Sequence, residues 1–119
     1  MSLAVISPQD AKLLFEKGAL LVDVRGPDEY AAEHIEKSLN VPIPQLRQGN
    51  VGEGDRAIVY LCKSGMRTKM NASALENAAK ADAFIMSGGI EGWKSAGYSV
   101  HRGEKSSAGM VSRLAKFFG

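Results

Sequence analysis

The chain has 119 residues and a mass of 12.7 kDa, the usual size of one domain with one hydrophobic core. Hydrophobic residues make up 45% and charged residues 24%, a balance that excludes disordered and fibrous chains. The formal net charge of +2 falls short of the basic surface that nucleic-acid binding requires, and no apolar run is long enough to span a membrane.

The N-terminal residues lack the basic segment and long apolar stretch of a signal peptide, so secretion is not expected. Cys62 is the sole cysteine, which rules out an internal disulfide and leaves too few thiols for a zinc site. We therefore expect a cytoplasmic protein that uses no metal ion and no organic cofactor.

The first helix is predicted to begin at Ser7-Pro8, because Ser7 can cap its first turn and Pro8 suits the first helical position. Gly18 is predicted to end this helix. The apolar residues 4–6 ahead of it could form a short strand.

Three continuous apolar runs, residues 19–24, 56–62 and 83–86, are typical of strands that are buried on both faces. Residues 39–41 and 98–100 are weaker strand candidates. Helical patterns alternate with these strands at residues 27–33, just after Pro44, at 66–80 and at 90–96. This alternation predicts an α/β fold with a mainly parallel sheet and helices on both faces.

Cys62 follows a predicted strand, and open α/β sheets bind ligands outside the carboxyl ends of their strands. After it come Lys63-Ser64-Gly65-Met66-Arg67 and then a helical pattern. A strand, a tight loop and a helix would place the sulfur at the mouth of a ring of backbone N–H groups, which together with a helix N-terminus holds an anion. This field, with Lys63 and Arg67, would favour the nucleophilic thiolate, provided that solvent reaches the sulfur.

A lone cysteine at the end of a buried strand is more often an inert apolar residue, and it is the loop around Cys62 that favours a nucleophile. Arg67 could stabilise either an anionic donor or the loop itself. Lys63 could set the local potential or simply be a solvated surface residue. Ser64 could contribute a hydroxyl to the sulfur.

Three separated motifs resemble the rhodanese domain. The first is Leu-Val-Asp-Val-Arg at 21–25, followed by Glu29-Tyr30, His34-Ile35 and Leu-Asn-Val-Pro at 39–42. The second is the loop 62–67, and the third is Gly-Gly-Ile-Glu-Gly-Trp at 88–93 with Gly97-Tyr98. The resemblance extends from about Pro8 to Val100.

The resemblance implies a three-layer fold, with a five-stranded parallel sheet between helices, and a single-domain thiosulfate sulfurtransferase that works through a Cys62 persulfide. It also implies that Asp23 and Arg25 form a mainly structural charge network that supports the site. Two positions depart from the family pattern: Glu33 replaces the usual Gly, and Ser99 replaces a frequent Pro.

Four residues separate Cys62 from Arg67, whereas cysteine phosphatases use five, and the shorter loop suits a single sulfur atom. We therefore expect sulfur to move from thiosulfate or a similar donor to cyanide, a small thiol or a protein thiol. The amides of residues 63–67 would bind the persulfide. A sulfur carrier or partner-binding module without turnover is the main alternative, and a phosphatase or arsenate reductase is less favoured.

The predicted domain covers residues 1–103, and residues 104–119 are predicted to be a flexible joint and a short, basic, amphipathic helix. Residues 99–119 hold four basic residues and one glutamate. This helix could pack on its own domain or dock on a second copy or a partner protein, and contact with a membrane surface is less favoured. The sequence leaves the oligomeric state open. An apolar stripe defines the helix: Met110, Val111, Leu114, Phe117 and Phe118.

Overall fold

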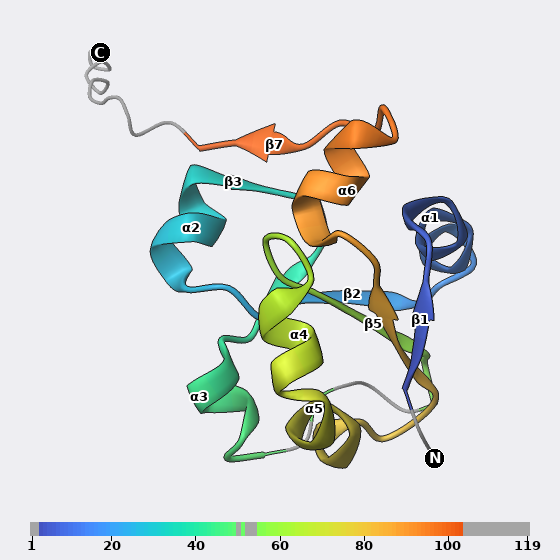
Figure 1. The fold of residues 1–119 in the computed structure, drawn as a ribbon, viewed down its shortest axis with the longest axis vertical. Coiled ribbons are helices and arrows are strands. Elements are labelled where there is room, and N and C mark those ends of the chain that lie inside the picture. Colours follow the sequence, from blue (N-terminus) through green and yellow to red (C-terminus); the bar gives the residue numbers. More distant parts are fainter. Residues whose placement is uncertain (1–2, 50, 52–54, 104–119) are drawn as a thin grey trace.

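The computed structural model describes residues 3–49, 51 and 55–103 (Figure 1). The predicted C-terminal joint and helix, residues 104–119, lie outside the described residues. None of the helices in the described part is long and apolar enough to cross a membrane.

Five parallel strands form the central sheet, as predicted. In sequence order the strands are β1 (Ala4–Ile6), β2 (Leu20–Asp23), β4 (Leu39–Asn40), β5 (Ile58–Leu61) and β6 (Ala83–Met86). Their order across the sheet is β1-β6-β5-β2-β4, so strand β5, which leads to Cys62, lies in the middle.

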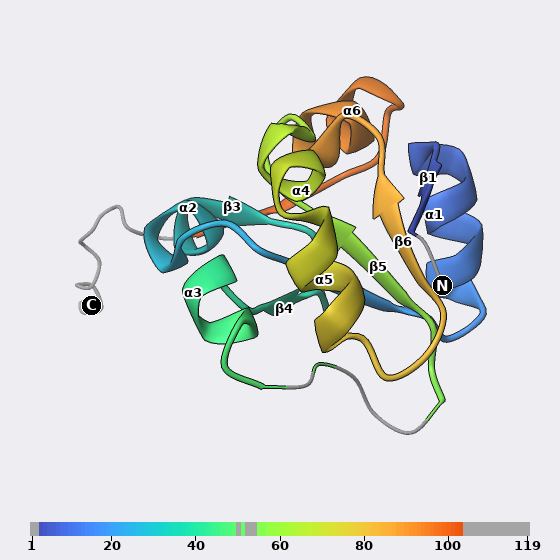
Figure 2. The same ribbon diagram turned by 60° about the horizontal axis from the view of Figure 1, so that its bottom comes forward.

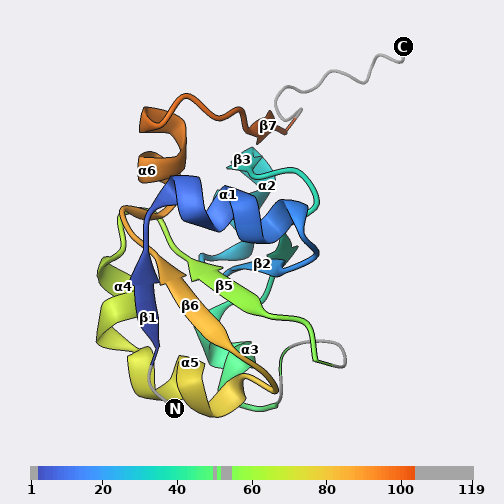
Figure 3. The ribbon, with the colours of Figure 1, turned by 90° about the vertical axis from the view of Figure 1, so that its right-hand side faces the viewer.

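Helices cover both faces of this sheet, which confirms the predicted three-layer arrangement (Figures 2 and 3). The helices α1 (Pro8–Glu16) and α6 (Gly89–Ser95) pack on one face. The helices α3 (Ile43–Leu46) and α5 (Ala72–Ala78) pack on the other, with α4 (Met66–Met70) leading into α5. The helix α2 (Pro27–Ala32) lies beyond the carboxyl end of β2 (Figure 1).

Alternation along β5 divides the apolar side chains between two cores. Ile58 and Tyr60 belong to the core under α3 and α5, whereas Val59 and Leu61 belong to the core under α1 and α6. All four are completely buried, which explains why this strand reads as a continuous apolar run. The same alternation puts Cys62 on the side of Tyr60.

The first helix begins as predicted. Ser7 has an extended backbone, and its hydroxyl accepts a hydrogen bond of 3.0 Å from the Asp10 amide. This cap satisfies one of the amide groups that a helix N-terminus leaves without an internal partner.

The single helix predicted over residues 66–80 is wrong, because the helix breaks at Asn71 into α4 and α5. The Asn71 side chain donates to the Arg67 carbonyl at 2.8 Å and accepts from the Arg47 guanidinium at 2.6 Å. An Asn side chain that bonds to nearby backbone competes with the helical ladder, which accounts for the break.

The strand predicted at residues 98–100 is also wrong. That segment wraps over α6, where Tyr98 packs edge-on against Trp93 and the Ser99 carbonyl accepts from the Trp93 indole at 2.9 Å. The next two residues form β7 (His101–Arg102), which pairs antiparallel with β3 (Glu33–His34) in a separate two-stranded sheet. This pairing also ends the helix predicted over residues 27–33 one residue early.

Candidate active site

Cys62 directly follows β5 at the carboxyl edge of the central sheet. Its Sγ accepts a hydrogen bond from the Gly65 amide, with a nitrogen–sulfur distance of 3.1 Å. Of the loop amides, that of Gly65 bonds to the sulfur in the described structure. Gly65 has a φ of 98°, a conformation that glycine adopts readily and other residues rarely. This turn aims its N–H at the sulfur.

The expectation of an open sulfur is wrong for the structure as it stands. Cys62 has an exposed fraction of 0%, so the closed loop covers its side chain and solvent has no contact with it. The physical reason is the compact turn, which brings Gly65, itself buried, to within hydrogen-bonding distance of Sγ. A reactant therefore reaches the sulfur only if the loop opens.

The N-terminus of α6 holds the loop on its other side. The amides of Ile90 and Glu91 donate to the carbonyls of Cys62 and Lys63 at 2.9 and 3.0 Å. The chains can approach this closely because residue 89 is glycine: a Cβ there would lie 2.3 Å from the Cys62 carbonyl oxygen. These contacts fix the direction of the peptide groups that follow Cys62.

Thr68 is a site residue that the sequence analysis missed. It is completely buried, and its hydroxyl donates to the Gly65 carbonyl at 3.0 Å and lies 3.8 Å from Cys62 Sγ. Thr68 thus fixes the glycine whose amide binds the sulfur. Its position three residues after Gly65 was the available signal, since Thr often bonds to a carbonyl one turn earlier.

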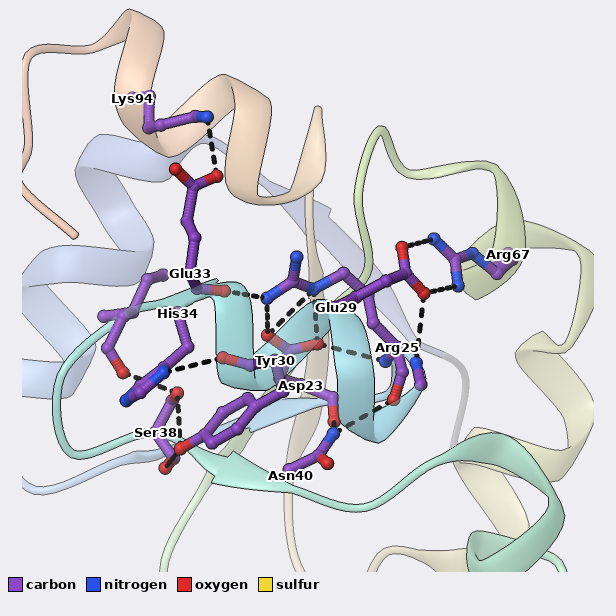
Figure 4. Close-up of polar contacts among 12 residues, drawn as sticks. Asp23, Arg25, Glu29, Tyr30, Glu33, His34, Ser38, Asn40, Arg67 and Lys94 are labelled. Carbon is purple, nitrogen blue, oxygen red and sulfur yellow. Dashed lines mark hydrogen bonds and ion pairs between the residues drawn. The ribbon is translucent and has the colours of Figure 1, made fainter. Parts of the chain in front are cut away.

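Glu29 is the second missed residue, and it binds Arg67 (Figure 4). Two parallel hydrogen bonds of 2.8 and 2.9 Å join the Arg67 guanidinium to the Glu29 carboxylate, which also accepts from the Gly26 amide at 3.1 Å. The bonds from Arg67 lower the pKa of Glu29 to about 2. Of the two roles considered for Arg67, this geometry is that of loop stabilisation.

The outer side of the loop is formed by exposed side chains. Lys63 lies 4.0 Å from the Glu91 carboxylate, and its side chain is 61% exposed. Ser64 is exposed, and its hydroxyl makes no hydrogen bond to Sγ in the described contacts. Met66 is 63% exposed. These three residues border the sulfur without contacting it through hydrogen bonds.

Asp23 and Arg25 form a buried ion pair at the end of β2 (Figure 4). The Arg25 guanidinium donates to both Asp23 oxygens at 2.9 to 3.1 Å and to the Glu33 carbonyl at 2.6 Å. The Asn40 amide group bonds to the carbonyls of Asp23 and Arg25. Neither charged group reaches Cys62 in these contacts, so the pair acts on the frame around the loop.

Glu33, at the first position that departs from the rhodanese pattern, links distant segments. Its carboxylate accepts from Lys94 of α6 at 2.7 Å (Figure 4) and pairs with Arg102 of β7 at 2.6 Å. The hydrogen bond from Lys94 is the main cause of the lowered pKa of Glu33. Glu33 therefore links the two-stranded sheet of β3 and β7 to α6.

The arrangement offers one cysteine, a backbone N–H group that bonds to its sulfur, and a loop held from both sides. No cluster of three metal-ligating side chains occurs among residues 3–49, 51 and 55–103. The chemistry that this geometry supports directly is covalent transfer through sulfur.

Comparison with known proteins agrees with this geometry. The model of the Rhodanese-like domain family matches residues 7–96. The chain is 31% identical over 91 residues to the thiosulfate sulfurtransferase GlpE of Pseudomonas fluorescens, covering 76% of this chain and 84% of the relative. It is 30% identical over 97 residues to YibN of Escherichia coli, covering 78% and 68% of the two chains.

A solved structure agrees as well. The rhodanese-related protein from Thermoplasma volcanium superposes with a TM-score of 0.72 and 28% identity, over 82% of this chain and 97% of that one. The matched family region includes the loop, the Asp23–Arg25 and Glu29–Arg67 pairs and the α6 contacts with the loop. The chain belongs to the family of rhodanese-like domains.

Proposed function

We propose that the protein is a sulfurtransferase that moves sulfane sulfur from thiosulfate, or a similar donor, to a nucleophilic acceptor through a Cys62 persulfide. The observation that carries this proposal is the 3.1 Å hydrogen bond from the Gly65 amide to Sγ. This fixed N–H donor points at the sulfur and would stabilise the negative charge of the anionic persulfide.

In the first half of the cycle, the Cys62 thiolate attacks the outer sulfur of thiosulfate. A bond forms between Sγ and that sulfur, the bond between the two thiosulfate sulfurs breaks, and sulfite leaves with the electron pair. In the second half, cyanide or a thiolate attacks the outer sulfur of the persulfide, and Cys62 leaves as the thiolate. The cycle needs no external oxidant.

Both steps require the loop to open, since Cys62 has no exposed surface. The outer side chains of Lys63, Ser64 and Met66 are solvated, so moving them breaks few contacts. Movement at Gly65 would uncover the sulfur, while the contacts of α6 with the carbonyls of residues 62 and 63 could remain. Access by loop movement is therefore part of the proposal.

A sulfur carrier or partner-binding module is the alternative from a different class, and it would use the same persulfide or the same surface without turnover. A phosphatase or arsenate reductase is less well supported. Either enzyme would bind its oxyanion substrate through the guanidinium of the loop arginine. In this structure, both terminal nitrogens of Arg67 already donate to Glu29.

The decisive assay is steady-state turnover of thiosulfate and cyanide by the wild type and by Cys62→Ser. We expect turnover in the wild type and none in the variant. Turnover that survives the substitution would contradict the mechanism, and a persulfide that forms without turnover would favour the carrier. Hydrolysis of p-nitrophenyl phosphate, measured in parallel, would favour the phosphatase.

We also propose a cytoplasmic location. The cytoplasm is a reducing compartment, and it would keep the catalytic thiol free to attack its donor. The small sulfur donor and the thiol or cyanide acceptor are its proposed partners. A protein thiol is a further candidate acceptor.

A further inference from the structure

The helix that follows the active-site loop turns an apolar face to solvent. Successive residues of a helix are rotated by about 100°, so Met66 and Met70 share a side of α4 that is opposite to Thr68. The burial agrees with this, because Thr68 is completely buried whereas Met66 and Met70 are 63% and 77% exposed. Two large apolar side chains thus stand side by side at the rim of the site.

Positive charge surrounds this pair. Lys69 and Lys63 are exposed beside the methionines, and Arg47 of the neighbouring segment bonds to Asn71 at the end of α4. Within residues 3–49, 51 and 55–103, no carboxylate lies within ion-pair distance of Lys69 or Arg47. We call Lys63, Met66, Lys69 and Met70, together with Arg47, the α4 face.

Resting on the proposed function, we propose that the α4 face docks a separate protein that exchanges sulfur with Cys62 and presents acidic side chains around an apolar contact. A small anion such as thiosulfate gains nothing from Met70, which lies one turn, about 5.4 Å, further along α4 than Met66. Methionine side chains adapt to varied apolar surfaces. Lys69 and Arg47, which face no carboxylate among the described residues, favour a partner of negative charge.

Charge argues against two other occupants. Residues 99–119 of this chain hold four basic residues and one glutamate, so that segment would meet the cations of the α4 face with like charge. A second copy that docked face to face would juxtapose the same cations. A separate acidic partner fits the face without this repulsion.

The exchange on this face is the second half of the cycle with a protein thiol as acceptor. The partner's thiolate attacks the outer sulfur of the Cys62 persulfide. A new sulfur–sulfur bond forms on the partner, the bond to Sγ breaks, and its electron pair remains on Cys62 as the thiolate. The partner leaves carrying the persulfide, and no redox reagent is consumed.

The test uses two synthetic peptides as probes, each with one cysteine flanked by Leu and Phe. One peptide carries Asp and Glu at its other positions, and the other carries Lys. The full chain is first loaded with sulfur from thiosulfate, and the rate of sulfur transfer to each peptide is then followed by mass spectrometry. We expect transfer to the acidic peptide to be faster by about tenfold or more at low salt, and this preference to fall as salt is added.

The variants Lys69→Glu and Met70→Gln lie outside the loop, so both should keep wild-type turnover of thiosulfate and cyanide. Lys69→Glu should weaken the preference for the acidic peptide, and Met70→Gln should slow transfer to both. Lys17→Glu and Leu13→Gln, two exposed substitutions at α1, are the matched controls and should change neither rate.

Equal rates for the two peptides, or wild-type rates for Lys69→Glu and Met70→Gln, would overturn the docking proposal while the cyanide assay still supports the enzyme. Self-association in sedimentation experiments that Met70→Gln abolishes would also overturn it, in favour of a second copy. If no sulfur is loaded on Cys62 at all, the proposed function itself fails, and the docking proposal falls with it.

Discussion

Two arginine–carboxylate pairs stand near the active site, and they differ in burial. The Asp23–Arg25 pair is almost fully buried, with side chains 0% and 5% exposed, and it makes further hydrogen bonds with the Arg25 amide and the Glu33 carbonyl. The Glu29–Arg67 pair has similar bond lengths, but its side chains are 37% and 40% exposed. The first joins residues two positions apart, whereas the second joins α2 to the loop.

Because of this difference in burial, we expect one pair to stabilise the fold and the other to position the active-site loop. A buried charge that loses its partner is costly, so the Asp23–Arg25 pair should control the free energy of unfolding. A half-exposed pair contributes little to stability because water and salt screen it. The Glu29–Arg67 pair should therefore act mainly on the geometry of the loop and on turnover.

The largest effect on stability is expected for Asp23→Asn, which leaves the Arg25 guanidinium buried without its counter-charge. We predict a loss of about 3–5 kcal/mol in the free energy of unfolding, measured by urea denaturation. Asp28→Asn, an exposed substitution on α2, is the matched control. An Asp23→Asn variant within about 1 kcal/mol of that control would refute the structural role of the buried pair.

Gly89→Ala should have the next largest effect. The added Cβ would lie 2.3 Å from the Cys62 carbonyl oxygen, in a residue whose φ is 58°, so either the loop or α6 has to move. We predict a loss of about 1–3 kcal/mol in stability, together with loss of thiosulfate and cyanide turnover.

Gly97→Ala is the control that separates backbone strain from steric overlap of the added Cβ. Residue 97 also has a positive φ, 92°, but a Cβ there would have no atom within 4 Å. This control should show a similar backbone cost of about 1–2 kcal/mol and normal turnover. Equal turnover in both variants would argue against α6 as a support of the loop.

Glu29→Gln should change stability by no more than about 1 kcal/mol. Turnover should fall by about ten- to a hundredfold, because Arg67 loses the carboxylate that holds it and the active-site loop is then no longer held in position. Glu91→Gln removes the carboxylate that lies 4.0 Å from Lys63, a longer and more exposed ion pair, and it serves as the control. Normal turnover in Glu29→Gln would leave the exposed pair without a role in positioning.

The smallest effect concerns pH. The pKa of Glu29 is lowered from 4.5 to about 2 in the folded protein, so its carboxylate stabilises the fold above pH 4.5 and loses this effect as the pH falls through about 2. The small stability difference between the wild type and Glu29→Gln should therefore be constant above pH 4.5 and vanish near pH 2. Urea midpoints across this range check it, and a difference that persists at the lowest pH would contradict the assignment.

The central sheet was predictable from the sequence because the patterns that mark its strands lie within short stretches of the chain. Each run of consecutive apolar residues marks a strand buried on both faces, and the cap at Ser7 and the stop at Gly18 bound the first helix within a few residues. The break at Asn71 was missed because the helical pattern continues past it through Ala72 and Leu75, and because one of the two hydrogen bonds that hold the Asn71 side chain comes from Arg47, 24 residues away. The pairing of β3 with β7 was missed because strands of two residues carry no periodic signal.

The candidate site divides in the same way. The position of Cys62 and the turn at Gly65 follow from a short stretch of sequence, so both could be named in advance. The partner of Arg67 could not, because Glu29 is 38 residues away and meets it only when α2 folds over the loop. The burial of Cys62 was also hidden, since it depends on how tightly the loop closes.

The central claim is that Cys62 takes up one sulfur atom although the closed loop buries it. The most direct measurement is the intact mass of the protein after incubation with thiosulfate, in the wild type and in Cys62→Ser. The account predicts that the wild type gains the mass of one sulfur atom, that cyanide removes it, and that the variant gains nothing. An unchanged mass in the wild type, or the same gain in Cys62→Ser, would contradict it.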